Sequence, residues 1–114
     1  MNHMLKAGCV LVVVLMTAGI ASAQNQAQID RGQKVYANQK CMICHSIAKQ
    51  GNTMGPLDGI GSKLSADEIR QWIVDAPVMA KKMKAERTPA MPAFTSLAKD
   101  ELDALVGYLQ SLKE

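Results

Sequence analysis

Two cysteines and a histidine lie within five consecutive residues, Cys41-Met42-Ile43-Cys44-His45. This Cys-x-x-Cys-His spacing suits covalent attachment of haem, because the two thiols add to the two vinyl groups of the porphyrin and form thioethers. The imidazole that follows directly is then placed to bind the iron from one face. The motif therefore predicts one covalently bound haem c, attached through Cys41 and Cys44, with His45 as an axial iron ligand.

Two other chemistries also use closely spaced cysteines. A redox dithiol is typical of a βαβ pattern, and no strand signal is visible in this sequence. A structural zinc ion needs four strong ligands, and beyond residue 23 the chain holds no cysteine or histidine outside the motif. Three cysteines in the whole chain are too few for a disulfide scaffold. The residues therefore favour haem attachment.

The first 23 residues have the pattern of a secretory signal peptide. Lys6 precedes apolar and small residues from Ala7 to Ile20, and Ala21-Ser22-Ala23 forms a small-x-small cleavage site. The apolar run is shorter than the roughly 20 residues of a membrane-spanning helix, so cleavage is favoured over an uncleaved anchor. Cys9 precedes most of that run and is interpreted as part of the signal. We expect a periplasmic protein without a permanent membrane anchor, whose mature domain covers residues 24–114.

Composition agrees with one small domain that lacks a large core of its own. The chain has 114 residues, of which 48% are hydrophobic and only 4% aromatic. A domain of this size buries little apolar surface, so a large flat apolar cofactor would supply the missing core. The formal net charge of +3 is too small to indicate nucleic-acid binding.

The elements that must position the motif begin with a helix and a long loop. The spacing of Ile29, Gly32 and Val35 predicts a helix over about 27–38. Residues 41–64 carry several glycines and no sustained period, so we expect a loop without strands. Ser65 and Glu68 are spaced as a capping box, which predicts that a second helix begins there.

The second half of the chain is predicted to be helical with one irregular stretch. Pro77 is expected to end the second helix, and a short lysine-rich helix is predicted over 78–85. The two prolines in residues 88–92 exclude regular helix there. The spacing of leucines predicts a strong amphipathic helix over about 98–112, with Lys113 at its end. The fold class is therefore all-α, with three or four helices.

Over nearly all of residues 27–112 the sequence resembles the class I cytochromes c of the small bacterial periplasmic type. The resemblance rests on four motifs: Cys41 to His45, Gly55-Pro56-Leu57, Met91-Pro92-Ala93-Phe94, and a helix pair in which Gly32 and Tyr36 would meet Leu105 and Tyr108. It implies an all-α, class I cytochrome c-like fold in which helices and loops wrap around one covalently attached haem. Ala98 departs from the family, where a serine or threonine usually caps the last helix, and Ser96 is the nearest alternative.

The resemblance also implies roles for individual residues. The carbonyl of Pro56 would accept the Nδ1 proton of His45, which fixes the tautomer of that ring. Met91 would be the second axial ligand of the iron. The indole of Trp72 would donate to a haem propionate, and simple core packing is its alternative role.

The residues themselves leave several candidates for the sixth iron ligand. A second histidine is excluded beyond residue 23, which leaves methionine, lysine or an open position. Pro89 and Pro92 flank Met91 and stiffen its segment, so Met91 is favoured, with Met79 and Met83 as alternatives. Met42 is interpreted as flexible core filler, and so is Met54.

Histidine and methionine ligation is the arrangement of electron-transfer haems, so we expect a single-electron carrier and not an enzyme. We expect a monomer that serves periplasmic redox-partner proteins. A basic run of Lys81, Lys82, Lys84 and Arg87 is either a docking rim for an acidic partner or a solvated helix face. Two alternative functions remain open: a haem enzyme or ligand sensor with an open sixth site, and the haem subunit of a larger oxidoreductase.

Overall fold

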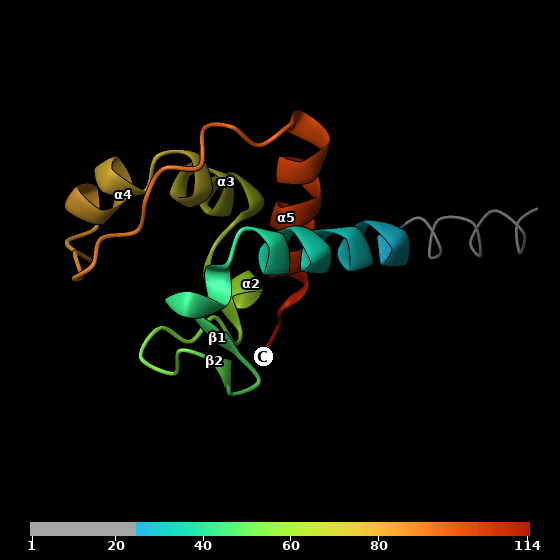
Figure 1. Cartoon of the computed structure of the whole chain (residues 1–114), viewed down its shortest axis with the longest axis horizontal. Helices are drawn as coiled ribbons and strands as arrows, with labels where there is room; N and C mark the ends of the chain where they lie inside the picture. Colours follow the sequence, from blue (N-terminus) through green and yellow to red (C-terminus); the bar gives the residue numbers. More distant parts are fainter. Residues whose placement is uncertain (1–24) are drawn as a thin grey trace, which may run out of the picture.

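The computed structural model describes residues 25–114, and the predicted signal peptide, with Cys9, lies outside this range. Residues 25–38 form an N-terminal helix. The elements that follow are the 3-10 helix η1 (Cys41–Ile43), strands β1 (Ser46–Ile47) and β2 (Gln50–Gly51), and helices α2 (Ile60–Lys63), α3 (Ala66–Val74), α4 (Ala76–Lys82) and α5 (Lys99–Ser111). Figure 1 shows a mostly helical arrangement, which confirms the predicted fold class. Within residues 25–114, no helix is both long and apolar enough to cross a membrane.

The N-terminal helix crosses α5 at close range (Figure 1). A Cβ atom at Gly32 would collide with the carbonyl oxygen of Ala104 and lie 2.5 Å from Cβ of Tyr108, so only glycine permits this approach. The rings of Tyr36 and Tyr108 meet edge to face, with centroids 5.9 Å apart and planes at 71°. The predicted helix crossing is confirmed.

The core lies between the N-terminal helix, α3 and α5. Its buried members come from these three helices: Val35, Tyr36, Ile69, Ile73, Leu105, Val106, Tyr108 and Leu109. At the edge of the core, Arg70 of α3 and Asp103 of α5 form an ion pair of 2.7 Å. The shared core and this ion pair hold α3 against α5. Helix α3 in turn supports one wall of the candidate site.

The segment 41–64 is more regular than the sequence predicted. It contains η1, a two-stranded antiparallel hairpin that pairs Ser46 with Gly51, and the single turn of α2. The hairpin turn is formed by Ala48 (φ 50°) and Lys49 (φ 64°), both in the left-handed region. Such turns usually carry Asn-Gly or Asp-Gly, so an Ala-Lys turn gives no sequence signal. The expectation of no strand is wrong for these residues.

The capping box at the start of α3 is confirmed. The hydroxyl of Ser65 accepts from the backbone N–H of Glu68, whose carboxylate accepts from the N–H of Ser65, both at 3.2 Å. The helix ends at Val74, as Pro77 suggested, but the proline itself lies in the first turn of α4. Proline is tolerated there because the first helical N–H groups have no partner within the helix. The short lysine-rich helix therefore begins earlier than predicted, at Ala76.

The last helix begins without a side-chain cap. Ala98 is its N-cap residue and Ser96 does not replace it. Asp100 and Glu101 in the first turn favour the positive end of the helix dipole, and Asp100 also pairs with Arg31 at 2.6 Å. At the other end, Lys113 donates to the carbonyl of Gly61 at 2.6 Å, which ties the C-terminal segment to α2.

Candidate functional site

A large apolar cavity lies between the attachment segment, residues 41–45, and the strap, residues 85–94, which follows α4. Its volume is about 780 Å³, within the range of cofactor pockets. Apolar side chains form most of the wall: Leu57, Ile60, Leu64, Ile69, Ile73, Pro77, Ala80 and Leu109. The wall also includes His45, Trp72, Met83, Arg87 and Met91. The fold thus brings together residues from distant parts of the chain that the sequence had marked separately.

His45 is held in the orientation that iron ligation requires. Its Nδ1 lies 3.0 Å from the carbonyl oxygen of Gly55. Since a carbonyl can only accept, Nδ1 carries the proton and the lone pair of Nε2 is available to a metal. Burial lowers the pKa of His45; the Gly55 carbonyl opposes this shift and the Arg87 guanidinium adds to it.

The predicted partner of His45, the carbonyl of Pro56, is wrong. Pro56 forms a parallel bridge with Ser46, in which Ser46 N–H donates to Gly55 at 3.1 Å and Leu57 N–H donates to Ser46 at 2.8 Å. Successive carbonyls of an extended chain point in opposite directions. The bridge therefore turns the Gly55 carbonyl, and not that of Pro56, toward the residues around Ser46.

Both cysteines of the motif are free and half-buried. Cys41 packs against the core, and burial, together with the nearby Cys44, raises the pKa of its thiol to about 11. This thiol is therefore neutral at pH 7. Neither cysteine lines the cavity, so His45 is the member of the motif that forms part of its wall.

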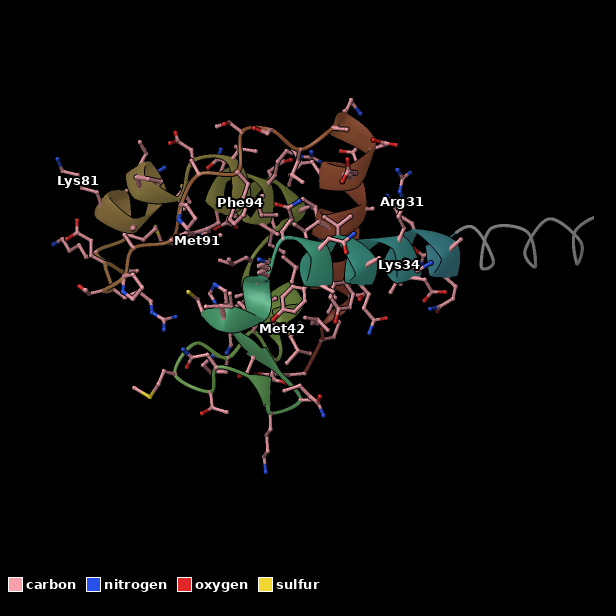
Figure 2. All side chains as sticks on the ribbon, in the orientation of Figure 1. Arg31, Lys34, Met42, Lys81, Met91 and Phe94 are labelled. Atoms are coloured by element: carbon pink, nitrogen blue, oxygen red, sulfur yellow. The ribbon has the colours of Figure 1, made fainter. Side chains whose placement is uncertain are left out.

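The methionines of the second half differ in whether they line the cavity. Met91 is half-buried and lines the cavity, and Met83, which is 51% exposed, lines it as well. Met79 is buried in the core and is not part of the wall. Figure 2 shows Met91 on the strap, with Phe94 further along beside α3. There the N–H of Phe94 donates to the carbonyl of Ile73 at 2.9 Å, which anchors the strap.

Two other methionines do not pack as the sequence suggested. Met42 is 46% exposed and Met54 is 83% exposed, so neither fills the core. Met42 lies on η1, which contributes no buried residue, and Met54 lies in the turn after β2. Both lie in segment 41–64, where helical spacing gave no indication of a buried face, and the prediction that they fill the core is wrong.

The basic run does not form one uniform surface. Lys81, Lys82 and Lys84 are exposed, and Lys81 points away from the body of the molecule (Figure 2). Arg87 differs, because its Nη1 donates to the carbonyl oxygen of Cys44 at 3.0 Å. Sequence reasoning missed this contact, and no local signal links two residues so far apart in the chain.

The residues present fit a covalently attached haem. The cavity is mostly apolar, as a porphyrin requires, and it presents the imidazole of His45 together with the thioethers of Met83 and Met91. The thiols of the motif lie in the turn directly before that imidazole. The family model described as Cytochrome c matches residues 29–113.

The chain belongs to the cytochrome c family. It is therefore a haem protein of electron transfer, and it carries a covalently bound c-type haem. Cytochrome c domains are typically extracytoplasmic.

The sequence is also similar to a cytochrome c oxidase subunit 2 from Alkalihalophilus pseudofirmus. The two are 25% identical over 93 residues, which cover 74% of this chain and 25% of that protein. The chain thus spans about a quarter of the length of the relative. No solved structure matches the chain.

Proposed function

We propose that this cytochrome c is a periplasmic single-electron carrier and not an enzyme, with one haem attached to Cys41 and Cys44. His45 and Met91 would hold the haem iron. The observation that carries the proposal is that both side chains line one apolar cavity, and that the Nδ1 of His45 is already engaged. A haem with two protein ligands has no position left for oxygen or peroxide, which favours electron transfer over catalysis.

The chain supplies the environment for this chemistry. When bound, the haem supplies a reversible one-electron change at its iron. The hydrogen bond to Gly55 holds the imidazole of His45 in one orientation and increases its basicity as a ligand. The thioether of Met91 favours the reduced iron and raises the reduction potential relative to two imidazoles. The apolar wall excludes water, so little rearrangement accompanies a change of charge.

The remaining roles follow from the same proposal. Residues 1–23 direct export and are removed, so that the mature carrier has no membrane anchor. It acts as a monomer. Trp72 lines the cavity, and its indole N–H is the donor for a haem propionate. Lys81, Lys82 and Lys84 form an exposed group that steers acidic redox partners.

Carbon monoxide binding tests the ligand assignment. The ferrous wild-type holoprotein should bind carbon monoxide poorly, because Met91 occupies the sixth position. Met91→Ala should bind it readily, whereas Met83→Ala, which alters another methionine of the same cavity, should behave like the wild type. Ready binding by the wild type would overturn the carrier proposal in favour of an open sixth site.

The similarity to an oxidase subunit supports a second candidate, in which this chain is the haem subunit of a larger oxidoreductase. The two candidates predict different oligomeric states for the protein isolated from its native membrane and periplasmic fractions. A carrier elutes as a monomer, whereas a subunit elutes with stoichiometric partner chains. Size-exclusion chromatography of the native holoprotein distinguishes them.

A further inference from the structure

Arg87 connects two segments that the proposed function needs to keep together. Its Nη1 donates to the carbonyl oxygen of Cys44 at 3.0 Å, across a separation of 43 residues. Cys44 lies in the attachment segment, and Arg87 lies on the strap, four positions before Met91. Within residues 25–114, no other hydrogen bond reaches the Cys44 carbonyl.

The strap has few other attachments. All residues from 81 to 90 are exposed, so burial does not hold the first part of the strap. The backbone N–H of Ala85 still bonds to Ala80 at the end of α4, and the next backbone bond is that of Phe94 to Ile73. In the described part of the chain, the Arg87 contact is the one hydrogen bond between these two anchors. It therefore shortens the stretch without hydrogen bonds on which Met91 lies.

Gly55 provides a second and independent observation. Its backbone is not in the left-handed region, so its conformation does not require glycine. Space does require it, because a Cβ atom would collide with the Arg87 guanidinium and with the Cys44 carbonyl. It would also lie 3.1 Å from Nδ1 of His45. The guanidinium thus occupies a place that the absence of a side chain leaves open, beside the hydrogen bond that orients His45.

We propose that Arg87 is a positioning residue that clasps the Met91 strap to the attachment segment. The inference rests on the proposed function, because it concerns the approach of Met91 to the iron. Opening the clasp would let the strap move away, so that another ligand could replace the thioether more easily. A hydrogen bond from a charged donor contributes on the order of 1.5 kcal/mol, which corresponds to about tenfold in such an equilibrium.

Imidazole added to the ferric holoprotein measures how easily Met91 is displaced. We expect Arg87→Gln to bind imidazole about tenfold more tightly than the wild type. Lys84→Gln is the matched control, because it removes one exposed positive charge from the same region without a hydrogen bond to the attachment segment. This control should change the imidazole affinity by less than about twofold.

A background without the strap ligand separates positioning from general loosening. In Met91→Ala, adding Arg87→Gln should leave the imidazole affinity unchanged, because no thioether remains to be displaced. An equal gain in both backgrounds would overturn the clasp, and so would an Arg87→Gln affinity no different from that of Lys84→Gln. Failure of the proposed function has a different signature: the wild-type ferric spectrum would lack the far-red band of iron-bound sulfur, which would overturn both proposals.

Discussion

The two walls of the haem cavity carry their iron ligands in different ways. On the attachment side, His45 lies between η1 and a hairpin, and its ring is bonded to a backbone carbonyl that is itself part of a bridge. On the other side, Met91 lies on an exposed strap held by Arg87 and Phe94. The imidazole is therefore positioned by secondary structure, and the thioether by a few separate contacts. The second ligand is therefore the more adjustable of the two.

Removing the ligand of the rigid wall should have the largest effect. We expect His45→Ala to reduce the yield of stable holoprotein by more than about tenfold, because haem then loses the ligand that the backbone holds in place. Haem staining after denaturing electrophoresis, normalised to total protein, measures this yield. Met91→Ala is the matched comparison and should retain covalent haem. An equal loss in both variants would remove the distinction between the walls.

A larger side chain at the helix crossing should lower the free energy of unfolding of the whole domain. Gly32→Val would force a branched side chain against Ala104 and Tyr108, and overpacking of this kind costs about 1–3 kcal/mol. Denaturant unfolding of the holoprotein measures the loss. Gly107→Ala on α5 is the control, because a Cβ there meets only the Gln28 side chain at ordinary contact distances. Equal stability of the two variants would show that the close approach is not required.

Loss of the α3 cap should weaken mainly the wall that supports the strap. Ser65→Ala removes the acceptor of the Glu68 N–H and should lower the free energy of unfolding by about 1 kcal/mol. The anchor of Phe94 on Ile73 lies at the opposite end of this helix. Ser96→Ala provides a control, because Ser96 is exposed and its side chain caps no helix. A Ser65→Ala variant as stable as that control would contradict the capping role.

The exposed lysines should affect kinetics and leave the ligands unchanged. Replacing Lys81, Lys82 and Lys84 together by glutamine should slow reduction by an acidic partner a few-fold at low salt, because steering charges are lost. The difference should disappear at high ionic strength. Stopped-flow reduction at several salt concentrations measures it. A rate unchanged at low salt would remove these lysines from partner docking and leave them as a solvated helix face.

Features encoded by neighbouring residues were accessible from the sequence. The attachment motif and the capping box follow from local spacing, and the crossing of Gly32 with Tyr108 was implied by the resemblance to the class I cytochromes c. The structure confirms the capping box and the crossing. The family of the chain followed from the same motifs. The assignment of Met91 as an iron ligand stays a prediction that its place on the cavity wall supports.

Features that depend on distant contacts were not accessible. The hairpin turn uses Ala48 and Lys49, which carry no turn signal, and Ala48 is held by a 2.7 Å bond from its N–H to the Asp58 carboxylate. The hydrogen bond of His45 goes to Gly55 and not to Pro56 because the bridge between Ser46 and Pro56 turns the Gly55 carbonyl toward His45. The contact of Arg87 with Cys44 depends on how the strap folds back, which local spacing cannot encode.

The absorption spectrum of the ferric holoprotein shows whether Met91 binds the iron. With His45 and Met91 on the iron, the wild type should show the weak far-red band of sulfur ligation. Met91→Ala should lose that band, and Met83→Ala should keep it, although both methionines line the cavity. A wild type without the band, or a band that persists in Met91→Ala and disappears in Met83→Ala, would contradict ligation by Met91.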